Sequence, residues 1–149
     1  MQRNLIFTVL FAGMILWANA CRAEMAIALG MTDNINKDGF VWGGGFGGAA
    51  RQQAIDICRG IKAPEVGKLP DNVPKAKSLC KIIADFSDSC FAIAQDGNVN
   101  KAATGVGWAV TYDLRSAEGQ ALAKCQAKAE PARRTACKVE YSHCDGSTN

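Results

Sequence analysis

Histidine is almost absent from this sequence, which contains His143 and no other imidazole in 149 residues. Most protein metal sites use histidine as a ligand, and Ser/His or Cys/His catalytic pairs use it as the base. One imidazole leaves little room for chemistry of either kind. We therefore predict no catalytic residue, no bound metal and no cofactor.

Excess charge of one sign is also scarce. Lys and Arg number 17 and Asp and Glu number 14, which gives a net charge of +3. Arg3 and Arg22 fall in the N-terminal leader described below, so the chain from Glu24 onward has fifteen basic and fourteen acidic residues. A protein that binds nucleic acid or a membrane surface through its overall field needs a larger excess. We expect no nucleic-acid partner.

Long hydrophobic runs are confined to one segment, the uncharged residues 5–18. As a helix this segment would span about 21 Å, which is shorter than the roughly 30 Å hydrocarbon core of a membrane. With Arg3 before it and small residues after it, the segment predicts a secretory signal peptide over residues 1–23 and no transmembrane segment. Cleavage after Ala23 gives a free protein, and the alternative cleavage before Cys21 gives a lipid-anchored one. Both place the protein in the periplasm or outside the cell.

The cysteines predict a disulfide framework. Without Cys21, six remain: Cys58, Cys80, Cys90, Cys125, Cys137 and Cys144. An even number in a small exported domain is typical of disulfides, and six cysteines allow 15 pairings. Zinc would need close Cys pairs or a cluster of histidines, and the sequence has neither.

Self-comparison reveals an internal repeat. Residues 25–28 recur as 91–94 at an offset of 66, residues 41–43 as 107–109 at the same offset, and residues 50–58 as 117–125 at an offset of 67. This comparison makes Trp42 and Trp108 equivalent. The repeat indicates a single domain over residues 24–149, composed of copies 24–90 and 91–144 and a short polar tail.

Each copy is predicted to contain two short strands, a helix and a third strand. In the first helix the apolar residues Ala50, Ala54, Ile57, Cys58 and Ile61 share one face. Strands of alternating polarity imply a sheet that is covered on one side. We therefore predict an α+β fold in which two tandem ββαβ repeats form a mainly antiparallel sheet with two helices on one face, cross-linked by disulfides.

The repeat also suggests how the cysteines pair. The cysteine at the end of each helix lies one loop before the next strand, which predicts the bonds Cys58–Cys80 and Cys125–Cys137. The remaining pair, Cys90–Cys144, is then expected to join the two halves about a pseudo-two-fold axis.

The order of these motifs, an Ala-Ile-Ala strand, a Trp-Gly strand, an Ala-rich helix ending in Cys, and Cys-Lys before a final Cys, occurs twice. It resembles the exported bacterial family catalogued as domain of unknown function 4189. The resemblance implies a secreted or periplasmic α+β domain without an accepted catalytic centre, associated in some bacteria with virulence or competition. The insertion from Ala63 to Ser78 departs from the family pattern and is either a site for a particular partner or a neutral loop.

Three further motifs imitate functional sites. Residues 43–48 match the GxGxxG template, but a dinucleotide site needs an alternating βαβ series, so we interpret the glycines as a strand closely approached by a helix. Asp96, Asn98 and Asn100 match the start of a calcium loop that is not continued, which favours a hairpin turn. Asp85 and Asp88 are expected to be solvated acids rather than a catalytic pair.

His143 stands next to Cys144, and such a pair can activate a thiol. We expect Cys144 to be disulfide-bonded, and a bonded sulfur is not a nucleophile.

The sequence therefore favours a non-catalytic exported binding protein whose partner is another protein. Its most concrete form is an inhibitor or immunity protein against an envelope-acting toxin or hydrolase, and the alternative is a secreted virulence effector or envelope enzyme. If exposed, the aromatic residues would form the partner surface. They are Phe40, Trp42, Phe46, Trp108 and Tyr112.

Overall fold

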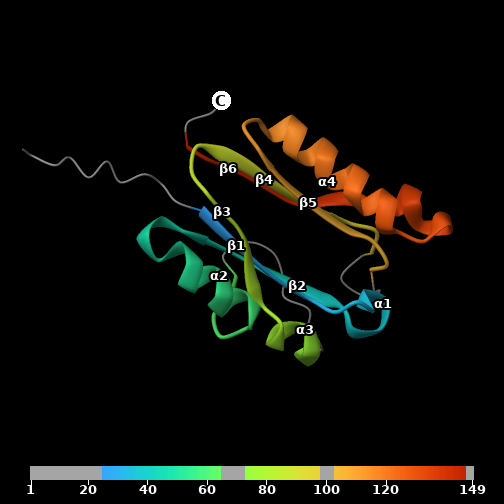
Figure 1. The fold of residues 1–149 in the computed structure, drawn as a ribbon, viewed down its shortest axis with the longest axis horizontal. Coiled ribbons are helices and arrows are strands. Elements are labelled where there is room, and N and C mark those ends of the chain that lie inside the picture. The colour runs from blue at the N-terminus through green and yellow to red at the C-terminus, as the bar shows by residue number, and fades with distance from the viewer. Residues whose placement is uncertain (1–24, 65–72, 98–102, 147–149) are drawn as a thin grey trace, which may run out of the picture.

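The computed structural model describes residues 25–64, 73–97 and 103–146 (Figure 1). The predicted signal peptide, Cys21, and the residues Asn98 and Asn100 of the calcium-like motif lie outside these ranges.

The chain forms two units of similar construction. The first contains β1 (Met25–Met31), α1 (Ile35–Asp38), β2 (Phe40–Phe46), the 3-10 helix η1 (Gly47–Ala49), α2 (Ala50–Cys58), α3 (Pro74–Ser78) and β3 (Lys81–Phe86). The second contains β4 (Ser89–Gln95), β5 (Val106–Thr111), α4 (Leu114–Lys128), the 3-10 helix η2 (Pro131–Ala136) and β6 (Lys138–Asp145). The predicted ββαβ order is present in both units.

Each unit forms its own antiparallel sheet of three strands, with orders β2-β1-β3 and β5-β4-β6. The predicted α+β class is confirmed. The grouping differs from the single sheet with two helices on one face: the two sheets face each other, and each has its own helix on the outer side (Figure 1). The physical reason is that the central strands β1 and β4 bury both of their faces, so one face needs a helix and the other needs a second sheet.

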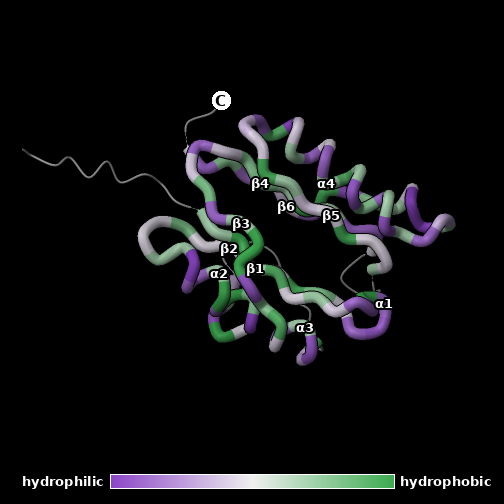
Figure 2. Tube along the Cα trace, viewed as in Figure 1, coloured by the Kyte–Doolittle hydropathy of each residue, from purple (hydrophilic) through white to green (hydrophobic). Residues whose placement is uncertain are grey.

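Large and small side chains are divided between the layers. The core between the sheets contains large residues such as Met25, Ile27, Phe91 and Ile93. The helix–sheet layers are built mostly from Ala and Cys, on Ala26 and Ala28 in one unit and on Ala92 and Ala94 in the other. Figure 2 shows hydrophobic stretches along β1 and hydrophilic ones along α1 and parts of α4. Small residues at the helix–sheet contacts let each helix approach its sheet closely.

Glycine makes this close approach possible. A Cβ atom at Gly43 would lie 2.4 Å from the carbonyl oxygen of Ala54 in α2. A Cβ atom at Gly107 would lie 2.2 Å from the carbonyl oxygen of Ala121 in α4. The close-packed interpretation of the glycine run is therefore confirmed at Gly43, and the same contact recurs in the second unit.

These contacts correct the predicted register of the repeat. Ala28 pairs with Gly43, and Ala94 pairs with Gly107. Gly43 and Gly107 are therefore equivalent, at an offset of 64, because the connection between the first two strands is two residues longer in the first unit. The predicted equivalence of Trp42 and Trp108 is wrong by two residues, although both belong to the core between the sheets.

The described cysteines form three disulfides: Cys58–Cys80, Cys125–Cys137 and Cys90–Cys144. The first two attach the end or last turn of a helix to the residue before the third strand of the same unit. Cys90–Cys144 does not join the halves as expected, because β4 begins at Ser89 and Cys90 therefore belongs to the second sheet, where it pairs with Cys144 on β6. All three bonds lie within units.

Candidate binding site

The aromatic residues predicted to contact a partner lie mostly between the two sheets. Phe40 is buried, and Trp42, Phe46 and Trp108 are half-buried against the same core. Tyr112, just after β5, is 85% exposed. The structure brings the first four together as an internal cluster, so the five residues do not form one outer surface.

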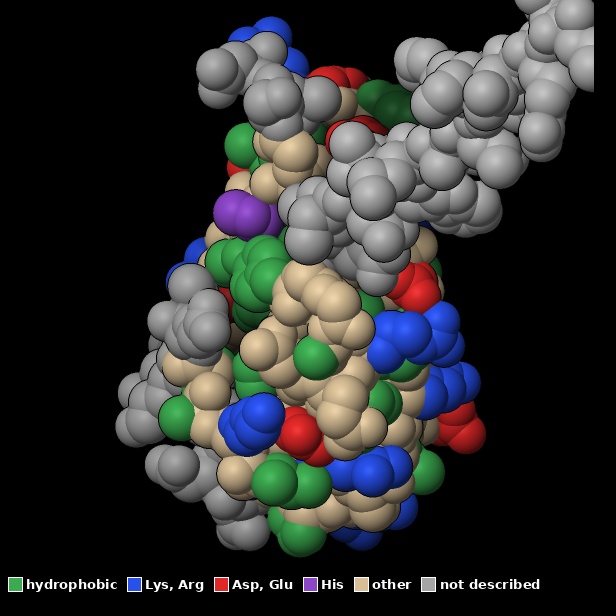
Figure 3. All heavy atoms as spheres, turned by 90° about the vertical axis from the view of Figure 1, so that its left-hand side faces the viewer, with side chains coloured by type: hydrophobic (Ala, Val, Ile, Leu, Met, Phe, Trp, Pro, Cys, Tyr) green, Lys and Arg blue, Asp and Glu red, His purple; other side chains and the backbone are tan. Residues whose placement is uncertain are grey.

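His143 belongs to the margin of this cluster. Its ring meets the edge of Phe46 at a centroid distance of 5.4 Å and stacks on Tyr141 at 6.3 Å. Figure 3 shows the histidine beside a group of hydrophobic side chains. Consecutive strand residues point to opposite faces, so His143 faces the aromatic side of β6 while Cys144 packs on the α4 side, bonded to Cys90. The thiol-activating arrangement is therefore not formed.

A pocket of about 370 Å³ opens where β1 ends. It lies between the β1–α1 connection and α3, which the sequence placed inside the insertion from Ala63 to Ser78. Its lining residues are Met31, Thr32, Asp33, Asn34, Asp38, Lys75 and Leu79. No sequence motif pointed directly to this pocket, and the only related signal was that the insertion departs from the repeat.

The position of α3 follows from one glycine. A Cβ atom at Gly30 would lie 2.1 Å from the carbonyl oxygen of Ala76, so only glycine lets α3 pack this closely on β1. Ala76 is fully buried at this contact. The packing fixes Lys75 on one side of α3 and Leu79 just after it. Met31 and Leu79 are 39% and 46% exposed, so the pocket has an apolar rim open to solvent.

The polar side of the pocket is organised around Asp38. Lys75 Nζ lies 2.8 Å from Asp38 Oδ2, and Thr32 Oγ1 donates a hydrogen bond of 2.9 Å to the same oxygen. The hydrogen bond from Lys75, followed by that from Thr32, lowers the pKa of Asp38 below its ordinary value. The carboxylate is thus ionised at neutral pH, and it links the β1–α1 connection to α3.

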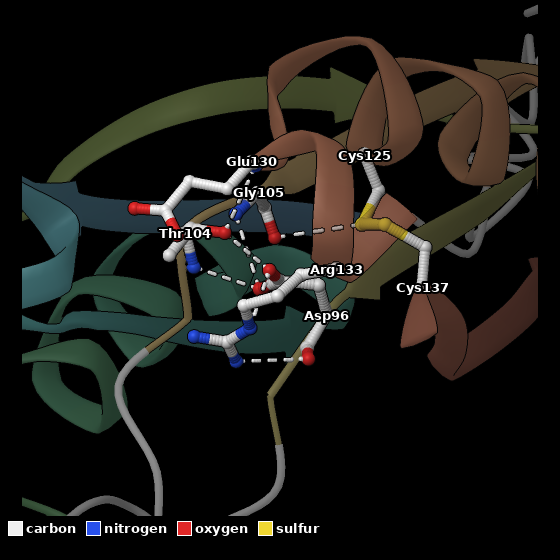
Figure 4. A network of polar contacts seen from close by, with 7 residues as sticks. All are labelled: Asp96, Thr104, Gly105, Cys125, Glu130, Arg133 and Cys137. Carbon is white, nitrogen blue, oxygen red and sulfur yellow. Dashed lines mark hydrogen bonds and ion pairs between the residues drawn. A yellow bond between two sulfur atoms is a disulfide. The ribbon is translucent and has the colours of Figure 1, made fainter. Parts of the chain in front are cut away.

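The second unit also contains an ion pair, but its carboxylate is buried and not open to solvent. Arg133 of η2 lies with its Nε 3.2 Å from Asp96 Oδ2 and donates a hydrogen bond of 3.0 Å to the Asp96 carbonyl oxygen (Figure 4). Asp96 also accepts hydrogen bonds from the backbone N–H groups of Thr104 and Gly105 and from the Thr104 hydroxyl. The Asp96 side chain is fully buried, whereas Lys75 in the first unit is 65% exposed.

The charge of Asp96 is stabilised entirely by its own chain. Burial alone would raise the pKa of this carboxyl group, but the hydrogen bonds from Thr104 and Gly105, together with the Arg133 charge, outweigh it and lower the pKa. Asp96 therefore anchors the β4–β5 connection to η2. This role agrees with the hairpin interpretation of the calcium-like motif.

Asp85 and Asp88, the two acids that could have formed a catalytic pair, have different surroundings. Asp85 forms an ion pair with Arg51 of α2. Asp88 occupies the β3–β4 turn with a φ of 51°. The structure gives them different partners and surroundings, consistent with solvated or ion-paired acids.

Within the described residues, no helix is long and apolar enough to span a membrane.

Comparison with known proteins identifies a family and no individual relative. No curated protein and no solved structure matches the chain. A family model described as Domain of unknown function (DUF4189) matches residues 25–144, which confirms the resemblance drawn from the repeated motifs. The chain therefore belongs to the DUF4189 family.

Proposed function

We propose that this protein is a non-catalytic binding protein that acts in the periplasm or after secretion and recognises another protein. The observation that carries the proposal is the pocket at the end of β1, with exposed Met31 and Leu79 at its rim. The pocket combines this apolar pair with polar and charged side chains of the β1–α1 connection and α3, and a concave site with convergent polar groups supports a role in binding. Disulfides such as these are typical of proteins that fold outside the cytoplasm.

The pocket is held by a firm frame. Met31 ends a central strand, and Leu79 directly precedes Cys80, which is bonded to Cys58 at the end of α2. Side chains presented by a fixed backbone lose little freedom when a partner binds, which favours affinity. This supports a function in recognition.

The groups that suggested chemistry are engaged by the chain itself. The six described cysteines all form disulfides, and the Asp96 carboxylate is saturated by its neighbours. This arrangement supports a role without catalysis.

The most concrete form of the proposal is an inhibitor or immunity protein that blocks an envelope-acting toxin or hydrolase. A small, cross-linked domain is suited to an oxidising compartment, where its disulfides persist. Its pocket rim can hold a partner loop in a fixed position and so block access to the partner's own active site.

Photocrosslinking tests the binding proposal. A benzophenone amino acid is introduced at position 31 or 79 in cells that produce the protein, with position 114 as the control because Leu114 is comparably exposed on α4. We expect positions 31 and 79 to give the same crosslinked protein and position 114 to give none. The absence of a crosslink from both pocket positions contradicts the proposal.

The inhibitor form is tested separately, by adding the purified protein to the crosslinked partner and measuring the partner's hydrolytic or toxic activity. Inhibition that is lost in the Met31→Ala/Leu79→Ala variant, and kept in Leu114→Ala, is expected. An active partner that the bound protein does not inhibit overturns the inhibitor form.

A further inference from the structure

The positive charge of the chain is concentrated in one stretch. Residues 59–81 contain six basic and two acidic residues, a net charge of +4, whereas the rest of the chain from Glu24 onward has nine basic and twelve acidic residues, a net charge of −3. The small net charge of the chain from Glu24 onward is therefore the sum of a basic segment and an acidic remainder.

The fold gathers the described part of this stretch at one place. The Cys58–Cys80 disulfide holds the end of α2 beside the start of β3, with 6.0 Å between the two Cα atoms. The ammonium group of Lys77 also lies over the turn after α2, because a Cβ atom at Gly60 would be 3.3 Å from its Nζ. The basic residues brought together in this way are Arg59, Lys62, Lys75, Lys77 and Lys81.

Exposed apolar side chains accompany these charges. Ile61, between Arg59 and Lys62, is 68% exposed, and Leu79 lies between Lys77 and Lys81. In Figure 3, basic and hydrophobic side chains lie next to one another at the lower end of the molecule, the end at which Figure 1 places α3. The pocket with its Met31 and Leu79 rim adjoins this area.

Several of the cations have no acid beside them. Lys62 lies 4.0 Å from Asp56, and Lys75 is paired with Asp38. Among the described residues, no carboxylate lies within ion-pair distance of Arg59, Lys77 or Lys81. Three positive charges are therefore left to interact with an external anion.

The basic residues 59, 62, 75, 77 and 81, together with the exposed Ile61 and Leu79, form what we call the basic–apolar surface. We propose that this surface binds an acidic segment of the partner protein. A hydrophobic side chain of that segment inserts at the pocket between Met31 and Leu79. The inference rests on the proposed binding function and names the chemistry of its partner. Opposite charges on two surfaces steer their encounter and fix their orientation, while the apolar contact supplies affinity.

A protein segment fits this surface better than an anionic membrane. Asp33 and Asp38 line the pocket beside Lys75, and a continuous layer of lipid phosphates would be repelled by these two carboxylates. A polypeptide can place its carboxylates over Arg59 and Lys77 and its apolar side chain at the rim.

The test uses the purified, disulfide-bonded protein labelled with ¹⁵N and an end-capped peptide of alternating Glu and Leu as the probe. We expect amide shifts in residues 59–62 and 75–81 and at Met31, weakened by added salt. A peptide of alternating Lys and Leu should leave these amides unchanged. Shifts centred on α4, or no saturable shifts, overturn the inference.

Charge reversal provides a matched control. Arg59→Glu/Lys77→Glu should weaken peptide binding by about tenfold or more, and Arg115→Glu/Arg134→Glu, which makes the same change of charge on the second unit, should alter it by less than about twofold. Equal effects of the two variants overturn the inference. So does tighter binding of the same residues to phosphatidylglycerol vesicles than to the peptide, which identifies a membrane as the partner.

The crosslinking experiment separates this inference from the proposed function. A protein that crosslinks at positions 31 and 79 but binds the Arg59→Glu/Lys77→Glu variant unchanged refutes the acidic segment and leaves the binding function intact. No crosslinked protein at either position refutes the binding function itself.

Discussion

Cys90 and Cys144 lie directly opposite each other on β4 and β6, with 3.9 Å between their Cα atoms. This disulfide therefore reinforces one sheet, and no disulfide among the described cysteines crosses from one unit to the other. The units are held together by the connecting chain and by the core between the sheets.

Cleavage of the connection between the units tests this arrangement. A protease site inserted in the β3–β4 turn at Asp88 is cut in the folded, oxidised protein, and the product is run on a denaturing gel without reductant. We expect two fragments, because each unit contains its own disulfides. A single band at the uncut mass would show that a disulfide joins the units.

The glycine contacts predict opposite effects of two Gly→Ala substitutions. Gly107→Ala places a Cβ atom against the backbone of α4 and should lower the free energy of unfolding by about 1–3 kcal/mol or more. Gly119 lies within α4, and apart from its chain neighbours and the nearby helix backbone no described atom lies within 4 Å of its Cβ position, so Gly119→Ala should raise that free energy by up to about 1 kcal/mol. Urea unfolding measures both, and a neutral Gly107→Ala would contradict the close approach.

The Asp96–Arg133 pair should contribute to stability. Arg133→Met removes the cation beside a buried carboxylate, and we expect a loss of about 2 kcal/mol in the free energy of unfolding. Arg134→Met is the control, since Arg134 is its exposed neighbour in η2. If the two variants unfold at the same urea concentration, the buried pair has no energetic role.

The lowered pKa of Asp96 gives this contribution a pH dependence. In the unfolded chain the carboxyl group takes up a proton near its ordinary value of 3.8, whereas in the folded protein it stays ionised to lower pH. Its stabilising effect is therefore complete above that value and is lost as the pH falls toward the folded pKa. The stability difference between the wild type and Asp96→Asn should shrink between about pH 5 and pH 2. A constant difference would show that the charge of Asp96 is not responsible.

The internal position of the aromatic cluster is also testable. Trp42 contacts Tyr141 at a ring distance of 5.0 Å, and Trp42→Ala should cost about 3 kcal/mol by opening the core between the sheets. Tyr112→Ala should change the free energy of unfolding by less than about 0.5 kcal/mol, because Tyr112 is exposed. Thermal unfolding compares the two variants, and similar losses would argue against an internal Trp42.

The local features of the fold could be read from the sequence because they depend on neighbouring residues. Ala54 and Cys58 lie four residues apart on one helical face, and both are fully buried. Alternating polar and apolar residues identified the third strand of each copy, and the repeated order of cysteines pointed to a bond between each helix and the strand that follows it. Each of these inferences needs only the periodicity of helices and strands or a short loop.

The long-range features could not be read in the same way. The alternating strands indicated a sheet covered on one side, whereas β1 and β4 are buried on both faces, so the second sheet was missed. The tryptophan alignment hid a two-residue difference in the connecting loops. The pocket depends on Lys75 reaching Asp38, which is 37 positions away in the chain, and on the contact of α3 with Gly30. Neither is encoded in a local pattern.

Confinement of the three described disulfides to their own units has a consequence for how the units hold together. The facing sheets meet through apolar side chains. Parting the sheets would therefore break none of the described disulfides, and each unit would keep its own sulfur bridges under oxidising conditions.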